Sequence, residues 1–135
     1  MSAINSPLEA PGKRKEVLTG AALTTTSGTL STATGANQCE GFVLAKIAGT
    51  GRYTATLSKA YNRVSYAAGS VEISAATAAV TAKGTAIALR GVSASGKVLT
   101  FQVLTPPLAA GPGVDVEVED GATIRVMIVC NRGTL

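Results

Sequence analysis

The chain has 135 residues, of which 46% are hydrophobic, and its 12 basic and 8 acidic side chains give a net charge of +4. This length supports one domain, since a chain of this size removes roughly two-thirds of its unfolded surface from water on folding. The absence of histidine excludes Ser-His-Asp and Cys-His catalytic pairs and imidazole metal sites. With two Phe, three Tyr and no Trp, the core is expected to be thin, and we expect partner subunits to add stability.

The N-terminal residues 1–16 contain two prolines and no hydrophobic period, which predicts an extended arm. They lack the apolar segment of a signal peptide, and no run approaches the ~20 apolar residues of a membrane span, so we expect a cytoplasmic chain without membrane contact. Lys13, Arg14 and Lys15 form the densest positive charge in the sequence. They could grip an acidic protein surface or nucleic acid, or simply keep the chain soluble. Because no aromatic side chains are interleaved, no specific nucleic-acid partner is predicted.

Threonine, serine and glycine dominate residues 17–36, which predict one or two short edge strands, with a flexible low-complexity segment as the alternative. Glu40–Ala48 is nearly continuous in apolar residues and ends at the turn Gly49–Gly51. Arg52–Lys59 follows with strict two-residue alternation. Its apolar face includes Tyr53, which is therefore expected in the core. The two segments predict a β-hairpin.

Further strands are predicted at residues 63–68, 71–80, 85–92 and 97–104. The first is expected to end at Gly69, and the second to contain a loop near residues 74–77. The last two alternate and predict a second hairpin, with Leu99, Phe101 and Val103 on one face.

The C-terminal third begins with a predicted loop, Thr105–Gly113, because Pro-Pro excludes a central strand. Val114–Glu119 then predicts a strand with three buried valines opposite three solvated acids. After a turn at Asp120-Gly121, Ala122–Cys130 is apolar on both sides, as expected of a central strand buried on both faces.

Together these segments predict an all-β fold, an antiparallel β-sandwich or barrel of about seven to eight strands. The predicted domains are the extended basic arm, residues 1–16, and a single β domain, residues 17–135. Cys39 and Cys130 lack Cys-x-x-Cys spacing, and we expect free, buried or half-buried strand residues, with a disulfide as the minor alternative.

Candidate chemistry is sparse. The acids Asp115, Glu117, Glu119 and Asp120 could be calcium ligands, but side chains two apart on a strand lie in a row rather than around a point. No serine or threonine has a histidine or a Ser-x-x-Lys lysine to activate it. We therefore predict that the chain is not an enzyme and has no cofactor or metal. Tyr61 and Tyr66 could instead form a sugar-stacking platform.

Three segments give the last two-thirds of the chain a resemblance to small structural proteins of tailed bacteriophages: GRYTATLSKAY, KVLTFQVL, and the closing VDVEVEDGATIRVMIVCNRGTL. The resemblance implies a virion structural protein, foremost a capsid decoration (cement) protein that binds the outside of the major capsid lattice and stabilises it. A phage tail or head-fibre component and a carbohydrate-binding β module are the alternatives.

For a decoration protein, the implied partners are the major capsid protein and further copies of the chain, with a trimer favoured. The implied location is the capsid surface, with the host cytoplasm during assembly. The candidate partner contacts are Lys13, Arg14 and Lys15 in the arm and Pro106, Pro107, Leu108 and Pro112 in the loop.

Overall fold

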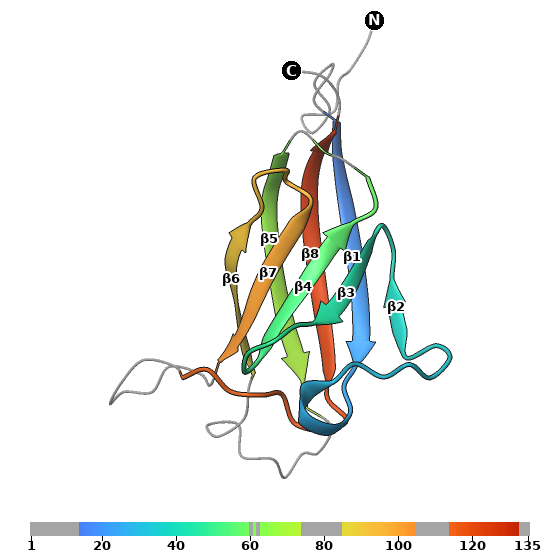
Figure 1. The fold of residues 1–135 in the computed structure, drawn as a ribbon. Helices are drawn as coiled ribbons and strands as arrows, with labels where there is room; N and C mark the ends of the chain where they lie inside the picture. Colours follow the sequence, from blue (N-terminus) through green and yellow to red (C-terminus); the bar gives the residue numbers. More distant parts are fainter. Residues whose placement is uncertain (1–13, 60, 62, 74–84, 105–113, 133–135) are drawn as a thin grey trace, which may run out of the picture.

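The computed structural model describes residues 14–59, 61, 63–73, 85–104 and 114–132. In these residues the chain is an antiparallel β-sandwich of two four-stranded sheets, which confirms the predicted fold class (Figure 1). The strands are β1 (Arg14–Leu23), β2 (Asn37–Cys39), β3 (Phe42–Lys46), β4 (Arg52–Leu57), β5 (Arg63–Glu72), β6 (Ala86–Val92), β7 (Val98–Leu104) and β8 (Thr123–Arg132), and a short 3₁₀ turn, η1, covers Thr26–Gly28. We call β2-β1-β8-β5 the back sheet and β3-β4-β7-β6 the front sheet.

The core lies between the two sheets and is built from the inward residue of every second position along the strands. β7 turns Leu99, Phe101 and Val103 inward, each at most 2% exposed. Tyr53 of β4 is 1% exposed. Both placements were predicted from alternation and are confirmed. The back sheet contributes the buried side chains Leu18, Ala22, Ile124, Val126, Ile128 and Cys130.

Both predicted hairpins are confirmed. β3 pairs with β4 across the turn Gly49–Gly51, and β6 pairs with β7. Gly51 has a φ of 67°, and a Cβ there would collide with the carbonyl oxygen of Val116. Only glycine fits this turn, because it combines a left-handed backbone with close approach of another segment.

The N-terminal third differs from the prediction of short edge strands. β1 is ten residues long and lies inside the back sheet, paired with β8 from Arg14↔Arg132 to Leu23↔Thr123. Its inward positions include Gly20 and Ala22, whose small side chains contribute little to a hydrophobic pattern. The predicted domain boundary after Glu16 falls within β1, and residues 1–13 lie outside the described residues.

β5 also differs from the prediction, because it continues through Gly69 to Glu72. A side chain at Gly69 would press on Ile87 of β6, with the added Cβ 3.0 Å from the Ile87 Cδ1 atom. The register of β5 against β8 shifts between Val64 and Tyr66, where Ser65 is the extra residue of a β-bulge. Since one extra residue exchanges the two faces of a strand, the bulge turns Tyr66 outward.

The predicted strand Val114–Glu119 is wrong. Apart from an isolated bridge between Leu104 and Asp115, the segment is irregular. Of its three valines only Val118 is buried, at 3%, whereas Val114 is 64% exposed. The segment runs past the Gly49–Gly51 turn and contacts it, so its two-residue alternation has no sheet to face. Residues 74–84 and 105–113, with their predicted loops, lie outside the described residues.

Candidate functional site

The predicted contact residues of the arm do not all belong to an arm. Arg14 and Lys15 are in β1, and the Lys15 Nζ donates to Asn131 Oδ1 of β8 at 3.4 Å. The strand register brings Arg132 opposite Arg14, and Arg63 beside Asn131. Basic residues from both termini of the described chain and from β5 therefore meet at one end of the back sheet. Lys13, Pro106, Pro107, Leu108 and Pro112 lie outside the described residues.

The acidic residues after the predicted loop hold the structure together. Glu117 accepts a 2.7 Å hydrogen bond from the Gly51 N–H and lies 3.4 Å from the Lys46 Nζ. Asp120 accepts a bond of 3.3 Å from the Ser27 N–H. In the described part of the chain no group of three or more Cys, Asp or Glu side chains could hold a metal ion.

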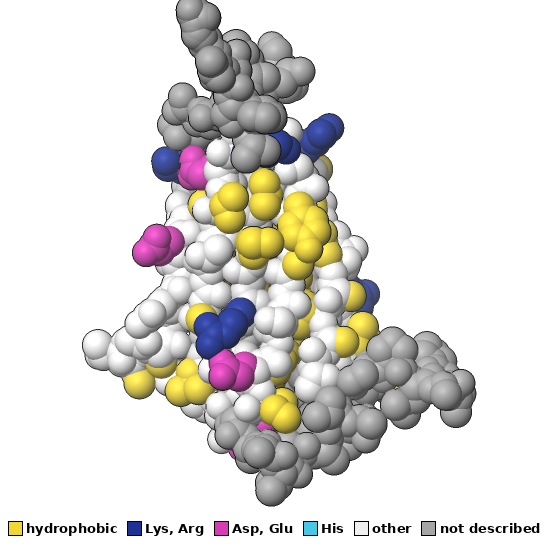
Figure 2. Space-filling model, turned by 180° about the vertical axis from the view of Figure 1, so that it is seen from behind, with side chains coloured by type: hydrophobic (Ala, Val, Ile, Leu, Met, Phe, Trp, Pro, Cys, Tyr) yellow, Lys and Arg dark blue, Asp and Glu magenta, His cyan; other side chains and the backbone are white. Residues whose placement is uncertain are grey.

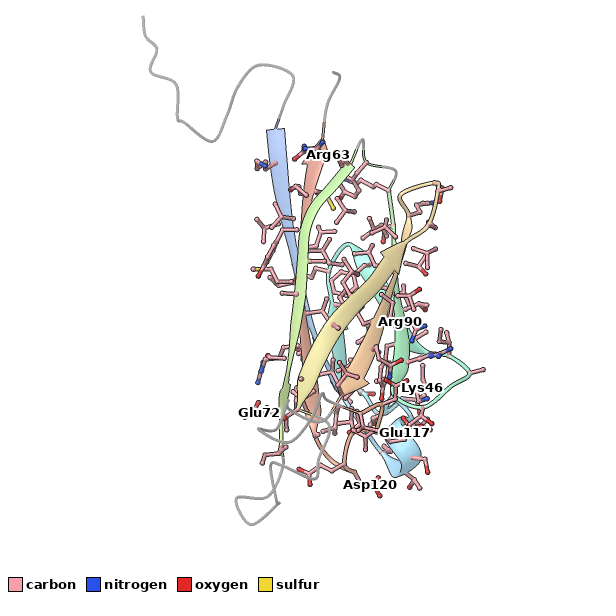
Figure 3. The ribbon with its side chains drawn as sticks, turned by 90° about the vertical axis from the view of Figure 1, so that its left-hand side faces the viewer. Lys46, Arg63, Glu72, Arg90, Glu117 and Asp120 are labelled. Carbon is pink, nitrogen blue, oxygen red and sulfur yellow. The ribbon has the colours of Figure 1, made fainter. Side chains whose placement is uncertain are left out.

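Lys46 and Glu117 lie close together at one end of the sandwich (Figure 3). Tyr53 belongs to the same polar cluster, because the Lys46 Nζ lies 5.6 Å from the centroid of its ring. Its hydroxyl donates a 2.6 Å hydrogen bond to the Gly28 carbonyl, which ties η1 to β4. Burial, and to a smaller extent the negative charge of Glu117, raise the pKa of Tyr53 well above its ordinary value. A buried phenol of this kind stays protonated at neutral pH and serves as a structural donor.

The two tyrosines considered for sugar stacking are not on one surface. Tyr61 is 9% exposed, and its hydroxyl donates to the Glu16 Oε1 at 2.7 Å. Tyr66, by contrast, is 53% exposed on the outside of the back sheet. A platform made of these two rings is therefore not formed, and Tyr66 alone could stack on a ligand.

Both cysteines are free, as predicted, Cys39 half-buried and Cys130 buried. Burial is the main reason that the pKa of each thiol is raised. Since the thiolate is the reactive form, neither cysteine has the environment of a nucleophile.

The feature that does stand out is the outward surface of the back sheet, which we call the outer face. Its side chains form five rows across β1, β8 and β5: Lys15, Asn131 and Arg63; Val17, Val129 and Tyr66; Thr19, Met127 and Ala68; Ala21, Arg125 and Ser70; Leu23, Thr123 and Glu72. The second is the apolar row and the third the middle row.

The apolar row is exposed. Val17 is 57% and Tyr66 53% exposed, Met127 of the middle row is 40% exposed, and Val129 is half-buried. Figure 2 shows hydrophobic side chains gathered on the upper part of this face, with an adjacent basic and acidic group below them. The prediction that β8 is buried on both faces is therefore wrong for this chain, because only its inward face is covered.

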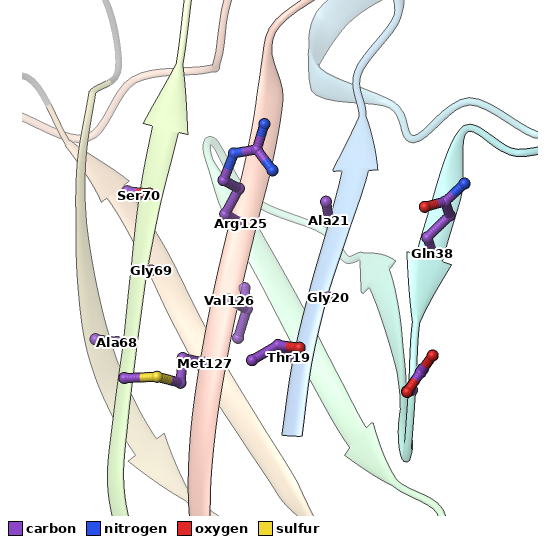
Figure 4. Close-up of a pocket in the computed structure, with 11 residues that line it drawn as sticks. Thr19, Gly20, Ala21, Gln38, Ala68, Gly69, Ser70, Arg125, Val126 and Met127 are labelled. Carbon is purple, nitrogen blue, oxygen red and sulfur yellow. The ribbon is translucent and has the colours of Figure 1, made fainter. Parts of the chain in front are cut away.

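Next to the apolar row the outer face is hollowed. The hollow has a volume of about 600 Å³, and its floor consists mainly of small residues of β1 and β5. Those residues are Thr19, Gly20, Ala21, Ala68, Gly69 and Ser70. Gln38 of β2 stands along one side of the hollow, while Met127 and Arg125 rise from β8 in its middle (Figure 4).

The outer face carries opposite charges at its two ends. Arg63 and Glu72 lie at opposite ends of β5 (Figure 3). Glu72 accepts a 2.6 Å hydrogen bond from the Arg125 Nη2 in the next row, an exposed ion pair. The basic end thus holds Lys15 and Arg63, and the other end holds an acid.

No family model, curated protein or solved structure matches the chain. In its described residues no helix is long and apolar enough to cross a membrane. The apolar outer face was within reach of sequence reasoning, because β8 is apolar on both sides. The placement of Tyr66 beside it was not, since a bulge leaves no mark in the hydrophobic pattern.

Proposed function

We propose that this chain is a structural protein that acts by binding protein surface, and that its setting is the capsid of a tailed phage, where it decorates and stabilises the shell. The observation that carries the proposal is the exposed apolar part of the outer face, which contains Val17, Tyr66, Val129 and Met127. Contiguous exposed apolar patches mark sites of protein association.

The three segments on which the phage resemblance depends are parts of the frame of this sandwich. Gly51–Tyr61 contains β4, the segment at 97–104 contains β7, and the closing segment contains β8, the strand whose outward side is apolar. A rigid sheet that holds a binding surface in a fixed orientation is consistent with a protein that binds the surface of a larger assembly.

Stabilisation of a shell requires only a modest contact in each copy. A standard patch of ~800 Å² per partner, repeated over the lattice, adds its effect many times. We assign the shell contact to the segments predicted from the sequence: residues 13–15, of which Arg14 and Lys15 lie at the basic end of the back sheet, and the Pro-rich segment 105–113.

The test is the copy number of the chain in purified virions, measured by quantitative gel or mass spectrometry against the major capsid protein. We expect hundreds of copies per particle. About a dozen copies or fewer would place the chain in the tail, and absence from particles would overturn the proposal. Stripping the chain from particles should lower the temperature at which the shells open.

A sugar-binding module is the second candidate, since the exposed Tyr66 ring lies one row from a hollow lined by Gln38, Ser70 and Arg125. An aromatic ring next to polar groups can stack on a sugar. A glycan-array signal from the native chain that disappears in Tyr66→Ala would favour this candidate over the structural one.

A further inference from the structure

We propose that the outer face binds the same face of a second copy of this chain. The two copies are related by a two-fold axis that crosses β8 near Met127 at right angles to the strands. This inference depends on the proposed function only in taking the outer face as a protein-binding surface, and it holds for any location of the protein.

The first argument is the composition of β8. Its inward residues Ile124, Val126 and Ile128 are at most 4% exposed, yet its outward residues include Met127 and Val129. The outward residues of β8 are Thr123, Arg125, Met127, Val129 and Asn131. Its outward side is therefore apolar at Met127 and Val129, and exposed apolar groups of this kind mark a site of association. A second copy supplies the missing cover, and it brings an equally apolar surface.

The second argument is area. β1, β5 and β8 have ten residues each, and at ~3.3 Å per residue and ~4.8 Å between strands they span roughly 33 by 14 Å. This plan area of roughly 460 Å², before the relief of side chains is counted, is a little over half of the ~800 Å² per partner of a standard interface.

The third argument is shape. A two-fold axis through the middle row brings the apolar row of one copy over the fourth row of the other, strand above the same strand. Tyr66 then faces Ser70 of the partner subunit, and Val17 faces Ala21 of the partner subunit. Tyr66 and Val17 thus meet small residues of the hollow of about 600 Å³, and between them Val129 faces Arg125 of the partner subunit. The face is complementary to itself along β1 and β5, as an isologous contact requires.

The fourth argument is charge, and it selects the direction of the axis. In the proposed arrangement Arg63 lies over Glu72 of the partner subunit, because these residues are at opposite ends of β5. An axis parallel to the strands would instead bring Arg63 over Lys15 of the partner subunit. Opposite charges in such a contact are favourable and like charges unfavourable. The antiparallel arrangement brings Glu40, which directly follows β2 and lies beside Thr19 at the edge of the hollow, near Glu40 of the partner subunit. By symmetry, however, it forms the Arg63–Glu72 pair twice, so the strands of the two copies run antiparallel.

The first experiment measures self-association of the full chain by sedimentation equilibrium. We expect a species of twice the 13.5 kDa chain mass. In Val17→Lys the dissociation constant of the dimer should rise about a hundredfold, because the two-fold symmetry buries the lysine ammonium in the interface twice. Val43→Lys is the matched control: Val43 is 64% and Val17 57% exposed, but Val43 lies on the front sheet, and its substitution should change nothing.

The second experiment fixes the axis by disulfide trapping. Tyr66→Cys mixed with Ser70→Cys should give a cross-linked heterodimer under mild oxidation, while the native chain, with Cys39 and Cys130 only, should not cross-link. Cross-linking of Tyr66→Cys with Val17→Cys instead would overturn the antiparallel arrangement, and so would a trimeric mass.

A monomer at all concentrations would overturn the inference. The two proposals fail separately. If the chain is monomeric but abundant in virions, the proposed self-contact is wrong and the structural function stands. If it is a dimer but absent from virions, the structural function is wrong and the self-contact stands.

Discussion

The outward side chains of the front and back sheets differ in kind, although both sheets turn aliphatic and aromatic side chains inward. The two central strands of the front sheet, β4 and β7, present threonines in register, such as Thr54 opposite Thr100, and the pair Arg52 and Gln102. The exposed large apolar side chains of this sheet are on its edge strands: Val43, Leu89 and Val92. The back sheet presents Val17, Val129 and Tyr66 in one row, with Met127 in the next. A sheet face that is to remain in water needs only the first kind of surface, so the second indicates a contact.

The buried polar side chain on the outward side of the front sheet also has its hydrogen-bond partners within the chain. Gln102 is 3% exposed, and its Oε1 accepts from the Arg52 Nε at 3.2 Å and from the Arg90 Nη1 at 3.1 Å. Its Nε2 donates to the Thr50 carbonyl at 2.7 Å. Buried polar groups with all partners present rigidify a structure and leave little to offer a ligand. Substitutions in the front sheet should therefore affect folding, and substitutions in the outer face should affect association.

The largest effect is expected at the front-sheet turn. Gly51→Ala should lower the free energy of unfolding by about 3 kcal/mol, because it combines a strained left-handed backbone with a collision against the Val116 carbonyl. Gly96→Ala is the control: its φ of 73° is similar, but the nearest atom to the added Cβ, the Tyr61 carbonyl oxygen, is 3.9 Å away. It should cost only about 1 kcal/mol. Equal losses in urea denaturation would refute the role of the close approach.

The next largest effect on stability is expected from removal of the buried side-chain amide of Gln102. Gln102→Leu should cost about 2 kcal/mol, since it leaves the Thr50 carbonyl and two arginines without this partner. Thr100→Val, on the same face of β7 and without such bonds, should change the free energy of unfolding by less than about 0.5 kcal/mol. Chemical denaturation of both variants measures the difference.

Tyr53→Phe should cost about 1 kcal/mol at neutral pH, because it leaves the Gly28 carbonyl without its 2.6 Å bond. The folded-state pKa of Tyr53 is raised above its unfolded value of about 10, so the stability that its protonated hydroxyl contributes is fully present below that value. It is lost as the pH rises from there through the folded pKa. Melting curves from pH 8 to 11 should show a smaller alkaline loss in Tyr53→Phe, and parallel losses would contradict the sign.

The smallest effect is expected on the outer face. Met127→Lys and Val17→Lys should each change the unfolding free energy of the dissociated chain by less than about 0.5 kcal/mol, since both side chains are at least 40% exposed. Denaturation at the lowest measurable protein concentration tests this. A loss above 1 kcal/mol would mean that the apolar row stabilises the fold itself, and the contrast between the sheets would disappear.

The sequence was sufficient for the fold class, both hairpins and much of the core. The alternation of Tyr53, Ala55 and Leu57, and of Leu99, Phe101 and Val103, identifies inward faces directly, because the two-residue period of a strand is visible in the side chains. The length and central position of β1 were not predicted, because its inward residues Gly20 and Ala22 have no large apolar side chain. The valines of residues 114–119 were misleading for the opposite reason: they do alternate, but the segment pairs with β7 only through the isolated bridge between Asp115 and Leu104.

The apolar part of the outer face could be predicted from the sequence, but the residues that border it could not. Apolar residues on both sides of β8 indicated two covered faces, and the structure assigns one of them to the core and leaves the other open. The bulge at Ser65 and the arrival of Arg63 and Arg132 at one end depend on pairing between distant strands. Such pairing follows from tertiary register, which local sequence does not encode.

The pairing of Arg14 with Arg132 in the antiparallel ladder between β1 and β8 puts the first and last described residues next to each other. A permuted chain that joins this pole by a short linker and opens between β6 and β7, at residues 93–97, would cut no strand. The turn 93–97 lies at the same end of the sandwich as Arg14 and Arg132, but on the front sheet (Figure 1). Because new ends at an exposed turn are generally tolerated, reporters could be attached there without crowding the surface assigned to the second copy.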